Sequence, residues 1–324
     1  HLWAEHYDRT LDDAFAIQSD VAQRIVAAVG AALSGAERQG LTAAPTANAE
    51  AYRLYLQGRE YSTRPGFVRQ NFEIAQQLFE RALALDPGFA LAHAALSEVH
   101  GRMYYFGHDP SPARAARQRE EAETALRLAP DLPQAHVAMG LVHYYGRRDY
   151  QRAMEEFRVA LNGLPNDARL QGLIAAVYRR LGNWDESVAA TERAEQLDPR
   201  DAVAFSDGAY TYRTMHRYAE AVRAFDRALR LAPDLHGAAI AKGWTYVLWR
   251  GQLDTLGAVL SRLPRDTYLQ GYGTTATQQV QLLLWERRAD SLLRVLVTAR
   301  AGVFEWGLSF VPSALYAAWA HQLR

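Results

Sequence analysis

The sequence predicts an all-α protein, an α-solenoid in which helix-turn-helix units stack side by side. Prolines close apolar helical runs at five places, and successive prolines lie 43, 35, 34 and 34 residues apart. These prolines are Pro87, Pro130, Pro165, Pro199 and Pro233. Small and aromatic residues also take the same places in several of the intervals. Self-similarity with a period of about 20 to 50 residues is the sequence signature of a repeat architecture.

The unit that ends at Pro233 shows the helical pattern most clearly. Ala221, Phe225 and Ala228 recur at steps of four and three residues, which places them on one face of its second helix. Small residues let paired helices approach closely, and an aromatic ring fills the space beside them. Proline ends the helix because it cannot continue the hydrogen-bond ladder. The corresponding residues before Pro165 are Ala153, Phe157 and Ala160, and those before Pro87 are Ala75, Phe79 and Ala82.

This period and these small and aromatic positions resemble the tetratricopeptide repeat, TPR. On that resemblance residues 47–264 comprise six TPR units that form a right-handed superhelix. Two units depart from the pattern by longer turns between their helices, at "STRPGF" in repeat one and "FGHDPSPAR" in repeat two. The sixth unit keeps Gly243 and Tyr246 but lacks the small residues of a typical second helix. We therefore expect a regular array that becomes irregular toward residue 264.

The two flanking segments differ from the repeats. Residues 1–46 read as the end of an upstream α/β domain, a long connecting helix and a linker. Their stretch "HLWAEHYDRTLDDAFAIQSDVAQRI" resembles the junction between a TolB amino-terminal-like domain and TPR units in bacterial multidomain signalling proteins. Such proteins carry a winged-helix, nucleotide cyclase or Ser/Thr kinase output domain. Residues 265–324 predict degenerate, truncated helical repeats, with a helix pair and a final helix from about Ser313. The chain therefore reads as a piece of a longer polypeptide.

The composition excludes several kinds of chemistry. The 36 basic residues balance 36 acidic ones, so net charge gives no reason to expect nucleic acid as a partner. The absence of cysteine excludes disulfides and thiolate metal sites. No apolar run reaches the roughly 18 residues that a membrane-spanning helix requires, and we expect a cytoplasmic location. Phosphate-binding loops, kinase signatures and the HExxH motif are also missing, so we expect no catalytic residue and no cofactor.

Four histidines recur at matching places. His93 and His100 occupy positions 4 and 11 of the first helix in repeat two, and His136 and His143 occupy the same positions in repeat three. If neighbouring first helices stack, the four rings could gather into a metal-binding or pH-sensitive cluster. The interpretation that we favour is packing with local hydrogen bonds, because histidine is often half-buried without a function. We therefore predict no metal site.

A solenoid exposes a concave surface, which in TPR proteins is lined mainly by the first helix of each unit. We expect positions 2, 5, 9 and 12 of each unit to face this surface. The candidate binding residues are Leu141, Tyr144, Arg169, Arg179, Tyr210, Arg213, Ile240 and Trp244. Arginine beside aromatic rings is typical of binding hot spots, and arginine can clamp carboxylates. An alternative is that neighbouring repeats or the C-terminal helices cover part of the groove, above all at Leu141 and Ile240.

The sequence therefore predicts a non-catalytic scaffold for protein–protein interaction, the TPR region of a larger bacterial regulatory protein. Its expected ligand is a peptide or protein with acidic groups, bound in the concave groove. Two alternatives stay open: the regulatory region of a Ser/Thr kinase or nucleotide cyclase, and a sensory domain for a small ligand. The oligomeric state is not predicted.

Overall fold

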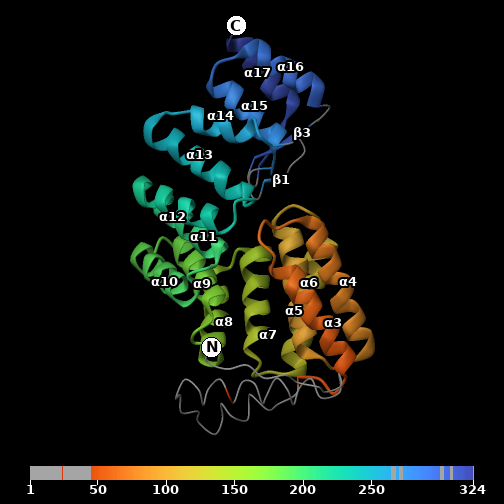
Figure 1. Cartoon of the computed structure of the whole chain (residues 1–324). Helices are drawn as coiled ribbons and strands as arrows, with labels where there is room; N and C mark the ends of the chain where they lie inside the picture. Colours follow the sequence, from red (N-terminus) through yellow and green to blue (C-terminus); the bar gives the residue numbers. More distant parts are fainter. Residues whose placement is uncertain are drawn as a thin grey trace.

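The structure is a computed structural model, shown in Figure 1. It describes residues 24, 45–263, 268–269, 273–299, 303–306 and 309–323. The helix and domain end expected in residues 1–46 lie outside the described residues, apart from residues 24, 45 and 46. From α3 onward the helices follow one another along an elongated array, as Figure 1 shows. The expected all-α solenoid is confirmed.

Six helical units make up the array. In each unit two successive helices pack against each other, and most units also pack through their first helices. The units are α3 (Ala49–Thr63) with α4 (Arg69–Leu85), α5 (Ala90–Tyr105) with α6 (Pro112–Leu128), α7 (Pro133–Leu141) and the π-helix η2 (Val142–Arg147) with α8 (Tyr150–Gly163), α9 (Ala168–Leu181) with α10 (Trp184–Leu197), α11 (Ala202–Thr214) with α12 (Tyr218–Leu231), and α13 (His236–Arg250) with α14 (Asp254–Leu260).

Local sequence sets the limits of these helices. Asp167 caps α9 and Asp201 caps α11, because each side chain accepts a hydrogen bond from a main-chain N–H of the first turn. At the other end, α12 stops at Leu231, two residues before Pro233. Proline shortly after a helix is common because it cannot continue the helical hydrogen bonds. The prolines that reveal the period in the sequence therefore also divide the array into units.

The core lies between the two helices of each unit, and in repeats one and three an aromatic ring of the second helix faces a glycine of the first. Phe79, Phe157 and Phe225 are fully buried. A Cβ atom built on Gly140 would lie 2.4 Å from Cε1 of Phe157, and one on Gly58 would lie 2.5 Å from Cε1 of Phe79. Only glycine allows the ring to lie this close to the first helix. The glycine and the phenylalanine that recur in the sequence are therefore partners in one packing contact.

Repeat three contains a feature that the sequence pattern did not predict. Its first helix changes at Val142 from α7 into the π-helix η2, which ends before Arg148 in the left-handed region at φ 52°. A π-helix takes more residues per turn than an α-helix, and single π turns inside helices are frequent at functional sites. This segment contributes Tyr144 and Tyr145 to the concave side.

The C-terminal part combines three helices with two short antiparallel strand pairs. In chain order these are β1 (Tyr268–Leu269), β2 (Gly273–Thr274), α15 (Thr275–Trp285), α16 (Ala289–Ala299), β3 (Val303–Trp306), β4 (Ser309–Pro312) and α17 (Ser313–Leu323). The helices lie where the sequence predicted a helix pair and a final helix, whereas the strand pairs were not predicted. None of the helices in the described part of the chain has the length and apolar character needed to cross a bilayer.

Candidate functional site

A groove of about 890 Å³ runs along the concave side of repeats two to five. Its walls come from α5, η2, α9 and α11, with contributions from the turn after α3 and the end of α12. Five of the eight candidate residues line it, namely Tyr144, Arg169, Arg179, Tyr210 and Arg213. Residues from three repeats, 69 positions apart in the chain, therefore share one surface.

The other three candidates do not line this groove. Leu141 and Ile240 are 0% exposed and belong to the apolar cores of repeats three and six. Trp244 is also buried, and its indole N–H donates to Oε1 of Gln278 on α15 at 2.6 Å. The alternative that neighbouring elements cover part of the concave side therefore describes these positions. Buried side chains offer a partner no surface, and we leave these three out of the proposed site.

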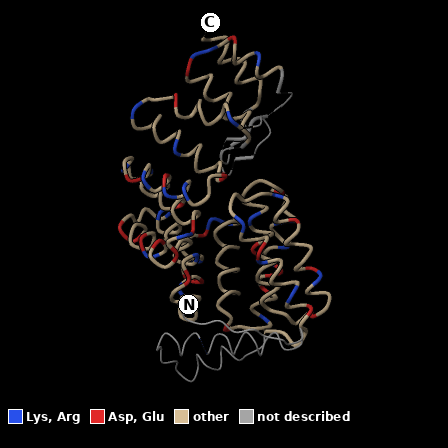
Figure 2. Tube along the Cα trace, in the orientation of Figure 1, with Lys and Arg blue, Asp and Glu red and all other residues tan. Residues whose placement is uncertain are grey.

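The groove carries an excess of positive charge. Seven arginines line it, against three aspartates. The arginines are Arg64, Arg102, Arg169, Arg179, Arg180, Arg200 and Arg213, and the aspartates are Asp198, Asp201 and Asp207. Basic and acidic residues are interspersed along the rest of the array, as Figure 2 shows, and the whole chain has no net charge. The excess is therefore a local property of the groove, and it favours an anionic ligand.

Contacts within and between repeats hold several of these arginines in place. Arg179 donates through Nη1 to the carbonyl oxygen of Asp207 at 3.1 Å and to Oγ1 of Thr211 at 2.8 Å. The guanidinium group of Arg213 lies 4.8 Å from the ring centroid of Tyr210. Fixed guanidinium groups lose less side-chain entropy when they bind a carboxylate. The groove is therefore preorganised for charged groups.

One wall of the groove is aromatic. The rings of Tyr105 and Tyr145 stack at 4.4 Å between centroids, and Tyr144 packs beside both. Arg180 donates from Nη2 to the phenol oxygen of Tyr105 at 3.2 Å and from Nε to that of Tyr144 at 3.4 Å. Burial raises the pKa of Tyr144 to about 12, so its phenol stays neutral and supplies no base. The wall offers apolar contact rather than acid–base chemistry.

The carboxyl group of Asp207, which lines the groove, has a raised pKa. Burial raises its pKa to about 6, while the positive charge of Arg179 acts in the opposite direction. The negative charge of Asp201 raises the pKa further. Asp207 therefore gains a proton close to neutral pH, and its charge in the groove depends on pH.

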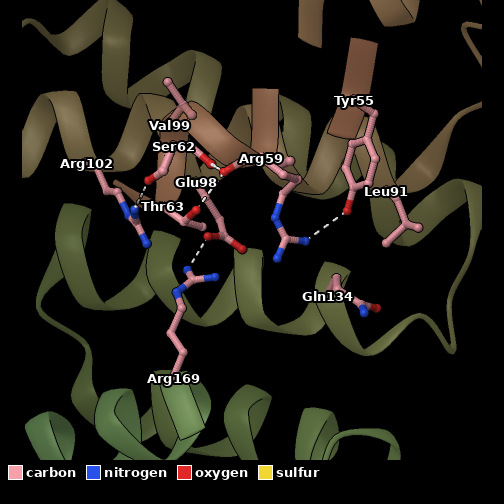
Figure 3. Close-up of a pocket in the computed structure, with 11 residues that line it drawn as sticks. Tyr55, Arg59, Ser62, Thr63, Leu91, Glu98, Val99, Arg102, Gln134 and Arg169 are labelled. Atoms are coloured by element: carbon pink, nitrogen blue, oxygen red, sulfur yellow. Dashed lines mark hydrogen bonds and ion pairs between the residues drawn. The ribbon is translucent and has the colours of Figure 1, made fainter. Parts of the chain in front are cut away.

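A smaller pocket adjoins the groove between α3, α5, α7 and α9, and it shares Thr63, Arg102 and Arg169 with the groove. Figure 3 shows the guanidinium groups of Arg59, Arg102 and Arg169 around the carboxylate of Glu98. Glu98 forms an ion pair with Arg169 on α9. This pair joins repeats two and four across the concave side.

Sequence reasoning did not name Arg59, Glu98, Arg102 or Gln134 as site residues. Arg59 and Glu98 stand at position 9 of their units and Gln134 at position 2. The expectation that positions 2, 5, 9 and 12 face the concave surface therefore includes these three residues. Arg102 stands at position 13, one residue beyond the last position that the rule included. Arg180 and Tyr145 share that position and also line the groove. The concave stripe of these helices is therefore one position wider than expected.

The four histidines do not form a cluster. His93 contacts Oε2 of Glu121 at 2.5 Å and the carbonyl oxygen of Pro87 at 3.0 Å. His136 makes the corresponding contacts one repeat later, with Glu156 at 2.7 Å and Pro130 at 2.9 Å. His100 instead accepts a hydrogen bond from Nη1 of Arg114 at 2.7 Å, and Nδ1 of His143 is buried with no hydrogen-bond partner among the residues that the structure describes. In the described part of the chain, no three His, Cys, Asp or Glu side chains are arranged to hold a metal ion.

Comparison with known sequences links the chain to two groups of proteins. The model of a tetratricopeptide repeat family matches residues 209–235, which lie in repeat five. Over 149 residues the chain is 31% identical to a protein described as putative adenylate cyclase 3 of Rhizobium meliloti (strain 1021). That match covers 46% of this chain and 25% of the relative, so the chain spans about a quarter of the length of the curated relative that it matches.

Solved structures with the same fold cover most of the chain. A tetratricopeptide repeat protein from Parabacteroides merdae ATCC 43184 aligns with a TM-score of 0.52 at 11% identity, over 85% of this chain and all of the other. A monomeric mutant of IFIT1, determined with m7Gppp-AAAA, aligns with a TM-score of 0.61 at 15% identity, over 87% of this chain and 63% of the other. At these identities the likeness concerns the fold alone. Together with the family match in repeat five and the 34-residue period, it shows that the chain has the tetratricopeptide repeat fold.

Proposed function

We propose that the chain is a non-catalytic scaffold that binds an acidic peptide, or an acidic segment of a partner protein, in its concave groove. The TPR fold supports a role in protein–protein interaction. The observation that carries the proposal for this chain is the groove itself, in which seven arginines face three aspartates beside an aromatic wall. Guanidinium groups bind carboxylates through paired hydrogen bonds, and tyrosine rings cover apolar side chains.

A binding experiment with a matched control tests this proposal. The probe is a fluorescent oligo-glutamate peptide with both ends blocked, and fluorescence anisotropy measures its affinity. Arg200 lines the groove and is exposed, and within the described residues its guanidinium group makes no hydrogen bond or ion pair. Arg223 on α12 is also exposed but lines neither pocket. We expect Arg200→Glu to weaken binding several-fold and Arg223→Glu to have little effect.

The choice of Arg200 keeps binding and folding apart. A change at Arg179 would also remove the hydrogen bonds that join α9 to α11, so weaker binding could follow from altered repeat packing. Added salt should weaken the peptide complex, because exposed charges are screened. Failure of the oligo-glutamate peptide to bind at low salt, or an equal loss in both charge-reversal variants, would overturn the groove assignment.

A second proposal concerns the whole protein. The similarity to a putative adenylate cyclase favours a nucleotide cyclase over a kinase as the output domain of a larger bacterial regulatory protein. In that protein residues 1–46 would join an upstream domain to the repeats of 47–264, and residues 265–324 would follow as degenerate repeats. We also propose a cytoplasmic location for this larger protein.

The reading frame around the chain tests this second proposal first, because a cyclase domain has to be encoded upstream. If it is present, cyclic nucleotide production by the full-length protein is measured with and without Arg200→Glu. A change in rate with unchanged substrate affinity is expected if the groove regulates the catalytic domain. A reading frame without any cyclase domain would refute the proposal.

A further inference from the structure

The small pocket beside the groove holds more positive than negative charge. Arg59, Arg102 and Arg169 line it, whereas Glu98 is its one carboxylate. Arg169 is paired with Glu98. The other two arginines donate to neutral acceptors: Arg102 to the carbonyl oxygen of Ser62 at 2.6 Å, and Arg59 to the phenol oxygen of Tyr55 at 2.9 Å. Arg59 and Arg102 therefore each carry a positive charge that forms no ion pair with the carboxylate of the pocket.

This imbalance costs free energy at Arg102, which is partly buried, because a charge removed from water is stable only when it is paired. Burial lowers the pKa of Arg102, and the nearby charge of Arg169 lowers it further, although Glu98 acts in the opposite direction. Burial raises the pKa of Glu98, but the charges of Arg169, Arg102 and Arg59 more than offset this and lower the pKa overall. Glu98 is therefore ionised, and one more anion in the pocket would be stabilised by the cations that Glu98 leaves unpaired.

The pocket also contains an acceptor without a donor. Oε1 of Gln134 on α7 is buried and has no hydrogen-bond partner within the described residues. A buried polar atom without a partner is costly, so a ligand that supplies an N–H group gains affinity there. The enclosed volume is only about 20 Å³, room for about one water molecule. Such a space admits the tip of a side chain, not a nucleotide.

We propose that this pocket binds one acidic side chain of the peptide held in the groove. In this arrangement the carboxylate faces Arg59 and Arg102, and Gln134 accepts a hydrogen bond from a main-chain N–H of the peptide. The assignment rests on the proposed function, since the pocket opens into the groove through residues that line both. It adds a defined subsite in repeats one to four to the general preference for acidic partners.

Two observations favour an acidic side chain over other anions. The arginines of the groove extend from repeat one to repeat five. Only side chains can supply several carboxylates, because a peptide has a single carboxyl terminus. Single-stranded RNA would need free aromatic faces on which its bases could stack. Here Tyr105 and Tyr145 stack on each other at 4.4 Å. The wall therefore suits a peptide better than a nucleic acid.

The first test removes a cation of the pocket. Arg59→Gln deletes one charge from an exposed residue of α3, and Arg53→Gln makes the same change on the same helix outside both pockets. Affinity for the end-blocked oligo-glutamate peptide is measured by isothermal titration calorimetry. We expect about tenfold weaker binding for Arg59→Gln, the usual effect of losing one charge-assisted hydrogen bond. Arg53→Gln should leave the affinity nearly unchanged.

The second test removes the internal carboxylate. Glu98→Gln leaves Arg169 free to bind the ligand, so affinity for the same peptide should rise several-fold. Glu73→Gln on α4 changes the net charge equally but lies outside both pockets. An equal gain in both variants would mean that only net charge matters, and the subsite would be refuted. Circular dichroism verifies that each variant keeps its helices.

Other outcomes also decide the matter. If only peptides with a free carboxyl terminus bind, or if an oligouridylate RNA displaces the oligo-glutamate peptide efficiently, the side-chain assignment is wrong. If Arg200→Glu weakens binding while Arg59→Gln and Glu98→Gln leave the affinity unchanged, the proposed function is supported and the proposed subsite is refuted. If the end-blocked peptide does not bind at all, the proposed function fails together with the subsite.

Discussion

Trp244 on α13 donates its indole N–H to Oε1 of Gln278 on α15 at 2.6 Å, and this contact closes the concave side at repeat six. Trp244 stands at position 9 of its unit, as Tyr210 does in repeat five. Tyr210 lines the groove, whereas Trp244 is covered by a C-terminal helix. The groove therefore ends where α15 packs on α13, and the C-terminal helices act as a cap of the repeat array.

Removing the acceptor of this hydrogen bond should loosen the cap. Gln278 is 1% exposed, so Gln278→Ala takes away a buried partner of the indole N–H. We expect the free energy of unfolding to fall by about 1–3 kcal/mol, the usual cost of a lost buried hydrogen bond. Urea denaturation followed by circular dichroism measures it. The exposed Gln252→Ala is the control, and equal stability of the two variants would contradict this account.

Two glycines of the first helices should respond oppositely to alanine. A Cβ atom on Gly140 would lie 2.4 Å from Phe157, whereas one on Gly172 would have no neighbour within 4 Å. Gly140→Ala should therefore destabilise the protein by about 1–3 kcal/mol through overpacking. Gly172→Ala should stabilise it by about 0.5–1 kcal/mol, because alanine restricts the unfolded chain and favours the helix. Thermal melts of both variants test the pair, and shifts of the same sign would count against the packing described.

Protonation of Asp207 should make peptide binding depend on pH. Because burial raises its pKa to about 6, Asp207 loses its charge as the pH falls through that value, while glutamate peptides with an ordinary pKa near 4.3 stay ionised. Affinity for the oligo-glutamate peptide should therefore rise as the pH falls from neutral toward 6. Asp207→Asn should remove most of this change, and affinity measured at several pH values provides the test. A variant that keeps the full pH dependence would assign it to another group.

The same residue should affect stability with a definite sign. A carboxyl group whose pKa is raised in the folded state contributes stability that is lost as the pH rises through the folded pKa. Ionised Asp207 is therefore unfavourable at neutral pH, although Arg179 offsets part of the cost. We expect Asp207→Asn to raise the melting temperature at neutral pH, with a smaller gain below about pH 6. A constant difference across this range would be inconsistent with a buried, titrating carboxyl group.

His100 should make the protein sensitive to acid. Burial, and the charge of Arg114 that donates to its ring, lower its pKa to about 4. Between about pH 6.5 and 4 the unfolded state binds a proton that the folded state does not, so stability falls as the pH falls. His100→Gln should flatten this dependence in denaturant unfolding, whereas a change at the exposed His321 should not. Equal slopes for the parent and His100→Gln would contradict the assignment.

Zinc should not stabilise the protein through the four histidines of repeats two and three. His93 and His136 are each held by a glutamate of their own repeat and by the carbonyl oxygen of the proline that ends the preceding repeat, and His100 is bound to Arg114. A metal ion would have to break these contacts before it gained ligands. The melting temperature should therefore be unchanged by zinc, and a clear increase would show that the rings can gather after all.

The sequence alone determined the solenoid, because its repeating signals are local. Proline spacing sets the period, and small residues such as Gly140 have to face aromatic rings such as Phe157 wherever two helices pair. The stacking of similar units then requires a concave side, so Arg169, Arg179 and Tyr210 could be assigned to the groove by counting positions. The ends of the second helices followed equally from the nearby prolines.

Only the tertiary structure decided which of those positions stay open. Trp244 has the same register as Tyr210 but is covered by α15, which comes from a later and less regular part of the chain. The π-helix of repeat three and the pocket around Glu98 also depend on contacts between repeats far apart in sequence, as the pairing of Glu98 with Arg169 shows. A periodic pattern records what every unit has in common, whereas exposure and charge balance depend on which particular neighbours meet.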